Sequence, residues 1–101
     1  MLINKNAYSK GDVLVFKLAN GDECVAKLIE QTDTEFVVTK PCTVIPGAKG
    51  IALVQSLFTG KLDVDIRIDK KHIIMSAPVV AEIEKYYIET TSGIALVSGA
   101  L

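Results

Sequence analysis

The stretch that decides the fold reads Leu62-Asp63-Val64-Asp65-Ile66-Arg67-Ile68-Asp69, then Lys70-Lys71-His72, then Ile73-Ile74-Met75. Apolar and polar residues alternate over its first eight positions, which predicts a half-buried strand. Two lysines and the only histidine of the chain interrupt this pattern, and an apolar run that reads as a second strand follows at once. We therefore expect a tight turn that displays three nitrogen-bearing side chains at one exposed point, where small scaffolds often carry binding residues.

Three further strands are predicted upstream of this stretch. Alternating residues indicate strands over 12–18, 23–29 and 35–39. Asn20-Gly21 separates the first two, and this dipeptide between alternating runs is a strong hairpin signal. Residues 30–34 read as the next turn. The three strands are expected to form an antiparallel meander whose register is set by these turns.

The middle of the chain connects the meander to the strand over 62–69. Pro41 is expected to end the meander, because proline cannot donate to a sheet ladder. Residues 46–50 contain proline and two glycines and predict a flexible loop, and the apolar run over 51–58 predicts another strand. Thr59-Gly60-Lys61 then reads as a turn. The whole chain is thus expected to hold five or six short strands.

A helix is predicted after the last strand. Ser76-Ala77-Pro78 reads as its entry, because proline suits a first helical turn, and Gly93 reads as its end. Apolar side chains recur at helical spacing and predict one buried face: Val79, Ile83 and Tyr86 or Tyr87. The tail Ile94–Val97 is also apolar, so we expect it to pack against protein.

Composition narrows the class of protein. A chain of 101 residues, half of them apolar, is long enough for one domain with one core. Neither a bilayer-spanning apolar run nor the apolar core of a secretion signal is present in the sequence. The net charge of −1 excludes a strongly basic nucleic-acid binder, so any such binding must come from a local patch. Cys24 and Cys42 are expected to be buried free thiols, which fits a reducing, cytoplasmic location.

Two segments resemble the motifs of the Sm-like family, the ring-forming RNA-binding Sm, LSm and Hfq proteins. Phe16–Glu23 is similar to the strand, Asn/Asp-Gly turn and polar pair that open the first Sm motif. Ile66-Arg67 resembles the pair that begins the second motif, and Lys71–Ile74 resembles the Lys-His-Ala-Ile of Hfq. Residues 12–39 and 62–77 carry the resemblance, somewhat under half of the chain.

The chain also departs from the family pattern. Thr32-Asp33-Thr34 stands where the family loop often carries an aromatic residue, and Ile68 stands where the second motif has glycine. The clearest helix signal follows the strands, whereas the family helix precedes them. The sequence is therefore most similar to the divergent Sm-like proteins that some phages encode.

The strand pattern and the resemblance together imply a mainly β fold in a single domain over 1–101. We expect a strongly bent, five- to six-stranded Sm-like (SH3-like) partly open barrel over about 11–77, with a C-terminal helix over about 78–92. Another small barrel of the SH3 or OB kind is the alternative. Such a sheet leaves open edges, and pairing edges head to tail between subunits would close a ring.

The resemblance places an RNA-binding site on two loops. Cationic groups suit phosphate, and imidazole or hydroxyl groups suit base edges. The residues expected to bind RNA are Lys70, Lys71, His72 and Arg67, with Thr32, Asp33 and Thr34 on the companion loop. A solvated turn, an ordinary Ser/Thr turn and an Arg67 pair with Asp65 or Asp69 are the structural alternatives.

Other chemistry finds less support in the residues. Asp63, Asp65 and Asp69 would share one strand face and could face a hard cation, but Arg67 lies among them, so no metal is expected. Tyr86 and Tyr87 fit a core or interface better than base stacking. A single histidine and the lack of any nucleophile or phosphate-loop motif predict no enzyme, no catalytic residue and no cofactor, although a Cys42–His72 pair stays open.

Two functions remain, from different classes. The first is a cytoplasmic homo-oligomeric ring of about five to seven subunits that holds single-stranded U- or A-rich RNA at its pore-side loops. DNA is the alternative ligand, and a role in RNA or DNA processing or regulation would follow. The second function is a structural or assembly ring that binds protein partners and no nucleic acid. Neither reading involves a membrane.

Overall fold

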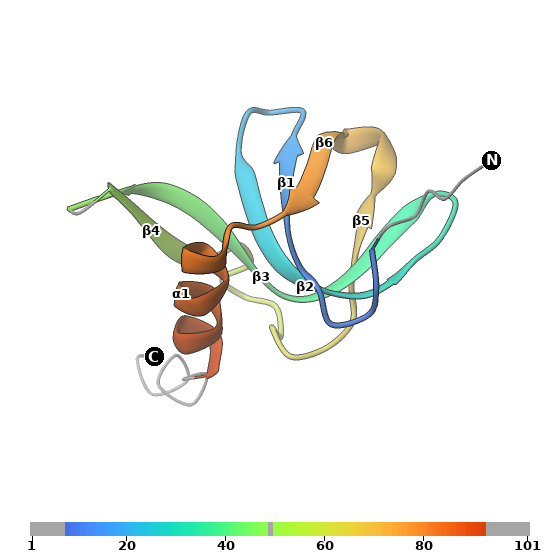
Figure 1. The fold of residues 1–101 in the computed structure, drawn as a ribbon. Coiled ribbons are helices and arrows are strands. Elements are labelled where there is room, and N and C mark those ends of the chain that lie inside the picture. The colour runs from blue at the N-terminus through green and yellow to red at the C-terminus, as the bar shows by residue number, and fades with distance from the viewer. Residues whose placement is uncertain (1–7, 49, 93–101) are drawn as a thin grey trace.

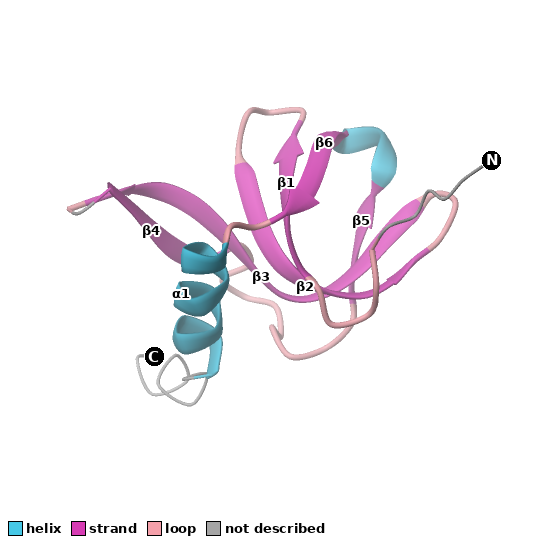
Figure 2. Cartoon of the chain, viewed as in Figure 1, coloured by secondary structure: helices cyan, strands magenta, loops and turns pink. Residues whose placement is uncertain are grey.

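A computed structural model describes residues 8–48 and 50–92. In this part of the chain, six antiparallel strands form one open sheet and a single α-helix follows them (Figures 1 and 2). The elements are β1 (Val13–Leu18), β2 (Glu23–Gln31), β3 (Glu35–Gly47), β4 (Gly50–Gln55), β5 (Ile66–Asp69), the 3-10 helix η1 (Lys70–His72), β6 (Ile73–Pro78) and α1 (Ala81–Ser92). The predicted mainly β fold with a C-terminal helix is confirmed.

The sheet is bent into a small, partly open barrel. Its strand order is β4-β3-β2-β1-β6, while β5 pairs separately with the first part of β3. The long β3 pairs with β5 over Glu35–Val38 and with β4 over Cys42–Gly47. The chain then passes from β5 through η1 to β6 (Figure 1). β5 pairs with β3 and β6 pairs with β1, so these two strands flank opposite edges of the β1–β2–β3 meander.

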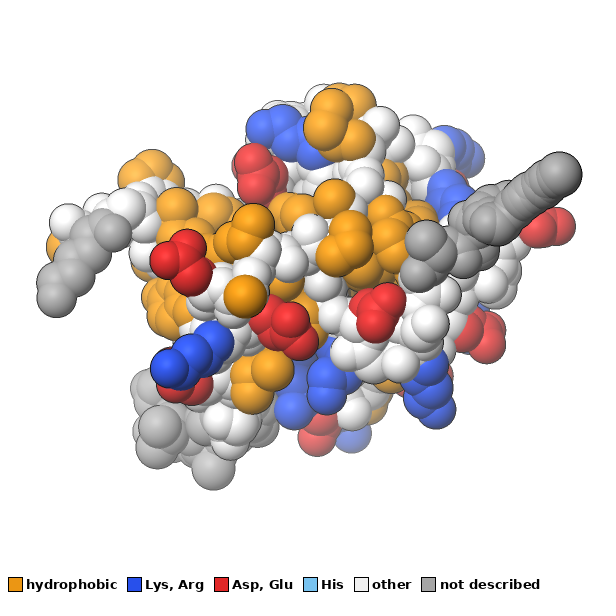
Figure 3. Space-filling model, viewed as in Figure 1, with side chains coloured by type: hydrophobic (Ala, Val, Ile, Leu, Met, Phe, Trp, Pro, Cys, Tyr) orange, Lys and Arg blue, Asp and Glu red, His pale blue; other side chains and the backbone are white. Residues whose placement is uncertain are grey.

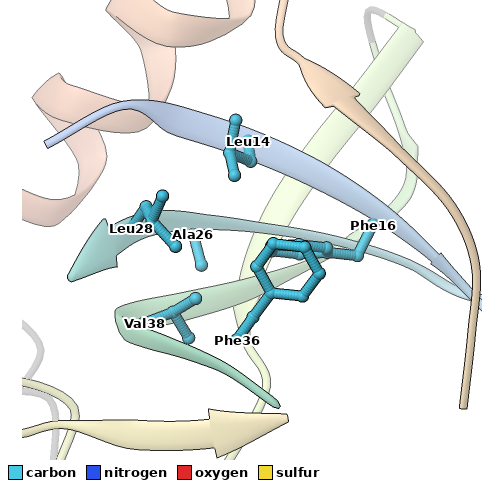
Figure 4. Close-up of a cluster of buried hydrophobic side chains, with 6 residues drawn as sticks. All are labelled: Leu14, Phe16, Ala26, Leu28, Phe36 and Val38. Atoms are coloured by element: carbon cyan, nitrogen blue, oxygen red, sulfur yellow. The ribbon is translucent and has the colours of Figure 1, made fainter. Parts of the chain in front are cut away.

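The inside of the curve holds the main core. Alternating residues of β1, β2 and β3 point inward and are almost completely buried: Leu14, Phe16, Ala26, Leu28, Phe36 and Val38 (Figure 4). The rings of Phe16 and Phe36 lie 4.9 Å apart between centroids and are tilted by 55°, a geometry that aromatic pairs favour. Ile66, Ile68 and Ile73 pack against this cluster from β5 and β6, which closes the barrel.

A second core lies on the outer face of the same strands. It contains Val13, Val25, Cys42 and Leu53 together with Tyr87 of α1. Three further side chains pack against it from the end of the chain: Val79, Ile83 and Tyr86. The predicted buried face of the helix is therefore confirmed. One face of β1 and β2 therefore points into the barrel core, and α1 packs against the other face.

The helix begins later than predicted. Ser76-Ala77-Pro78 continue β6 instead of opening a helix, with Pro78 opposite Leu14 at the end of the ladder. Proline is tolerated there because β6 is an edge strand and needs no donor toward solvent. Gly93 and the apolar tail over 94–97 lie outside the described residues, so the predictions made for them stay untested. No helix in the described ranges is both long and apolar enough to cross a membrane.

Pro41 does not end the meander, contrary to prediction. The register of β2 on β3 changes from Lys27↔Thr39 to Val25↔Cys42, so two residues of β3 oppose the single residue Ala26. This is a β-bulge, which leaves residues of the bulged strand out of the ladder. The missing N–H of Pro41 falls in the bulge and costs no ladder bond. β3 therefore continues to Gly47 and forms a long hairpin with β4 in place of the predicted loop over 46–50.

Two predicted strands are shorter than expected. β4 ends at Gln55 rather than Phe58, and only Ile66–Asp69 of the stretch over 62–69 is a strand. β3 turns away at its bulge, so no strand lies beside residues 62–65 to complete a ladder. Leu62 still contacts β3, because its carbonyl accepts hydrogen bonds from Lys40 N at 2.7 Å and from Thr39 Oγ1 at 3.1 Å.

Candidate nucleic-acid interface

The turn between the last two strands is a short 3-10 helix with an acidic cap. The carboxylate of Asp69 accepts a hydrogen bond from Lys71 N at 3.0 Å, which satisfies one of the free donors at the start of η1. None of the three η1 residues is buried, and Lys71 and His72 are exposed. The predicted exposed cationic turn is therefore present.

The structure brings this turn next to the β2–β3 turn, which lies far from it in the sequence. β5 and β3 pair with Glu35 opposite Asp69. Directly beyond this pair, Lys70 N donates a hydrogen bond to the carbonyl oxygen of Thr34 at 2.8 Å. The two loops that were expected to form one site thus share a backbone contact.

Thr32 has a structural task in the β2–β3 turn. Its Oγ1 accepts hydrogen bonds from Glu35 N at 3.0 Å and Thr34 N at 3.3 Å. This is the ordinary Ser/Thr turn named above as a structural alternative. Asp33 and Thr34 remain exposed beside it. Two of the three predicted loop residues thus offer side chains to a ligand, and Thr32 shapes the loop that presents them.

Lys70 and Arg67 are held by neighbours on β2 and β3. The Lys70 ammonium donates a hydrogen bond to Gln31 Oε1 at 3.0 Å and lies 5.1 Å from the centroid of the Phe36 ring. Arg67 forms an ion pair with Glu35 at 3.1 Å. A pair with Asp65 or Asp69, which the sequence also allowed, is not formed. β5 brings Arg67 to the side of β3, whereas Asp65 precedes the strand.

Lys71 and His72 are the most available members of the group. Lys71 lies 3.8 Å from Asp69, and 75% of its side chain is exposed. The carbonyl of His72 accepts a hydrogen bond from Ala19 N at 2.8 Å, which ties the turn to the β1–β2 hairpin. The backbone is therefore fixed while the imidazole and the Lys71 ammonium face solvent, the arrangement that a preorganised binding loop needs.

Sequence reasoning missed the residues that hold these cations. Gln31 and Glu35 fix Lys70 and Arg67, yet neither was a candidate. A signal was available, since Glu35 begins a strand and could meet a cation on a neighbouring strand. It could not be used without knowing that β5 pairs with β3.

The residues considered for other chemistry do not assemble into a site. Asp63 and Asp65 lie before β5, not on one strand face with Asp69, and no group of three metal-binding side chains occurs in the described ranges. Cys24 and Cys42 are free and buried, as predicted. Burial raises the pKa of Cys42 to about 11, with the neighbouring Cys24 as a second cause. The thiol is therefore protonated at neutral pH, which is not its nucleophilic form.

Comparison of the sequence with protein families and curated proteins does not assign this chain to a family. No protein-family model matches the sequence, and no curated protein is detectably similar to it. The likeness to the Sm-like family therefore rests on the motifs described above and stays a proposal.

Proposed function

We propose that this chain is a divergent, cytoplasmic Sm-like protein that binds single-stranded RNA. The proposed ligand surface combines the η1 turn with the β2–β3 turn: Arg67, Lys70, Lys71 and His72 on the first, Thr32, Asp33 and Thr34 on the second. The observation that carries the proposal is the hydrogen bond from Lys70 N to the Thr34 carbonyl at 2.8 Å. Because of this contact, cations and exposed polar groups from distant segments form one surface that suits both phosphate and base edges.

A ring would make such a small site effective. The chain carries a net charge of −1, so one subunit offers little general attraction for a polyanion. A head-to-tail ring of about five to seven subunits would repeat the site around a pore and raise the effective concentration of each successive contact. The open edges of β4 and β6 supply the backbone groups for such contacts.

The deciding experiment measures binding of fluorescein-labelled oligo-U and oligo-A by anisotropy at low salt. The double variant Lys71→Ala, His72→Ala should bind more weakly than wild type while keeping its oligomeric state. Removing the lysine should also reduce the salt slope by roughly 0.7 for each phosphate that it neutralises in the wild-type complex. As a control, Lys85→Ala on α1 removes one positive charge far from the turn and should change neither the affinity nor the salt slope. Wild-type protein that binds neither oligomer would refute the proposal.

A second function is favoured by a different observation. Ile74 and Met75 on the edge strand β6 are 60% and 63% exposed, and Val80, between β6 and α1, is 63% exposed. Figure 3 shows further hydrophobic side chains between the β3–β4 hairpin and α1. Exposed apolar groups beside an open edge suit a protein partner, as in a structural or assembly ring. A stable ring with no RNA affinity at low salt would support this function.

A further inference from the structure

Phe58, in the loop between β4 and β5, stands out among the exposed residues. Its side chain is 74% exposed, the largest value among the exposed large hydrophobic residues of the described ranges. The other described aromatic residues are buried or half-buried. Leu57, the neighbour of Phe58, lies beside Gly60 of the same loop. An aromatic ring this exposed, on the loop over residues 56–65, has no role in the core.

Phe58 lines a cavity of about 270 Å³. The walls are Leu53 and Val54 of β4, Leu62 of the following loop and the last turn of α1. Polar groups reach the same cavity: Lys40, Gln55 and Thr90. The volume is just under the roughly 300 Å³ at which typical small-molecule pockets begin, so it suits one planar base better than a whole nucleotide.

The position of Lys40 in this cavity is fixed by an unusual backbone. Lys40 has φ of +53°, in the left-handed region that side chains rarely adopt. Its N–H donates to the Leu62 carbonyl and its own carbonyl accepts from the Tyr87 hydroxyl. Its ammonium makes no hydrogen bond or ion pair within the described parts of the chain. Lys40 and Phe58 thus line the same cavity, and the Lys40 ammonium has no partner within the described residues.

We propose that Phe58 and this cavity bind one base of the same single strand, with Phe58 stacked on the base and Lys40 on an adjoining phosphate. Stacking on an aromatic side chain beside a cation is how single-stranded nucleic acids are held without strong sequence preference. The side-chain carbonyl of Gln55 and the hydroxyl of Thr90 add groups for the base edge, while the Gln55 amide nitrogen donates to the Leu57 carbonyl at 3.2 Å. The lining is mainly apolar, which suits the face of a base, and the Lys40 ammonium favours a ligand that carries a phosphate over an apolar peptide side chain.

The inference rests on the proposed function, because it assigns a second contact to the same ligand. The site is separate from the η1 turn: Figure 1 places η1 and the C-terminal end of α1 at opposite ends of the molecule. The two sites would therefore engage different nucleotides of one strand, and the effects of removing each should be independent.

Four variants of one loop test the inference, with oligo-U and oligo-A anisotropy as the readout. Phe58→Ala and Phe58→Leu should each weaken binding by about five-fold to about 100-fold, because both remove the stacking face. Phe58→Trp should bind as well as wild type. Because the natural chain has no tryptophan, the introduced side chain gives the only tryptophan fluorescence, and the stacked base should quench it. Leu57→Ala removes an exposed apolar side chain that does not line the cavity, so it should leave binding unchanged.

Lys40→Asn tests the phosphate contact without disturbing the backbone, because asparagine tolerates the left-handed region. It should weaken binding and lower the salt slope by roughly 0.7. A Phe58→Leu variant that binds like wild type would overturn the inference. So would a Phe58→Ala variant that changes only the oligomeric state, because Phe58 would then be a protein contact.

The same measurements separate this inference from the proposed function. If Lys71→Ala, His72→Ala weakens binding and Phe58→Ala does not, the inference fails and the proposed site stands. If only Phe58→Ala weakens binding, the inference stands and the site at the η1 turn fails. If wild-type protein binds neither oligomer, both are overturned.

Discussion

The hydroxyl of Tyr87 donates a hydrogen bond to the carbonyl oxygen of Lys40 at 2.8 Å, across 47 residues of sequence. The same hydroxyl lies 3.1 Å from the carbonyl of Thr39. Helix α1 therefore satisfies backbone acceptors at the bulge of β3, where the ladder leaves them without partners. The ring of Tyr87 is 1% exposed, so a single side chain both fills the second core and supports the bend of the sheet.

Tyr87→Phe should lower the free energy of unfolding by about 1–2 kcal/mol. The ring still fills the core, but the carbonyls of Thr39 and Lys40 lose a donor in a place that water reaches poorly. Urea unfolding followed by circular dichroism measures the change. Tyr86→Phe is the matched control and should stay within about 0.5 kcal/mol of wild type. Equal effects of the two substitutions would contradict the role assigned to the Tyr87 hydroxyl.

Substitutions at Lys40 should reveal its left-handed backbone. Holding a side chain in this region costs roughly 1–2 kcal/mol, and a β-branched residue tolerates it worst. Lys40→Gly should therefore unfold at a higher urea concentration than Lys40→Val. At Lys27, on the facing part of β2, the order should reverse, because an extended strand favours valine over glycine. A Lys40→Val variant that is more stable than Lys40→Gly, the order expected at Lys27, would show that the backbone at Lys40 is not strained.

Stability should fall in mild alkali, with Cys42 as one cause. Burial raises the pKa of its thiol from the usual 9.0 to about 11, so the unfolded chain releases this proton at lower pH than the folded chain. The contribution is complete below about pH 9 and is lost as pH rises to about 11. Cys42→Ala should flatten this decline in urea unfolding. Val44→Ala on the same strand should lower stability equally at every pH, and an unchanged decline in Cys42→Ala would exclude the thiol as a cause.

The proposed ring should depend on the edge strand β6. Met75→Lys places a charge on an exposed apolar side chain beside the open edge, where assembly would bury it at high cost. Light scattering should show about five to seven subunits for wild type and fewer for the variant. Ile88→Lys on α1, also exposed, serves as the control and should assemble normally. Wild-type protein that is a monodisperse monomer at micromolar concentration would refute the ring.

Removal of residues 78–101 should prevent folding or assembly. The deletion exposes the second core by removing Tyr87, Val79 and Ile83. Burial of such side chains contributes roughly 1.5–3 kcal/mol each, which is a large part of the stability of a small domain. Circular dichroism and light scattering of the truncated protein test this. A truncated protein that folds and assembles like the full chain would contradict the role assigned to the helix.

Local patterns were sufficient for the first two strands, the turn between them and the buried face of the helix. The alternation in β1 and β2, and the Asn20-Gly21 turn between them, depend on interactions within a few residues, and such interactions can be read along the chain. The exposed turn at Lys70–His72 was predictable for the same reason. The position of this turn next to Thr32–Thr34 was inferred only through the resemblance to the Sm-like family, since no local pattern links the two segments.

The misplaced boundaries all depend on which strands become neighbours. Pro41 reads as a terminator in any local pattern, but a bulge opposite Ala26 makes its missing donor harmless. Residues 62–65 alternate like a strand, yet β3 has turned away and provides no ladder for them. Likewise, the partners of Arg67 and Lys70 follow from the pairing of β5 with β3. Hydrogen bonds and ion pairs between distant segments exist only once the chain has folded. The alternation of residues therefore determined where strands form, whereas the bend of β3 and its pairing with β5 determined which side chains meet at the candidate site.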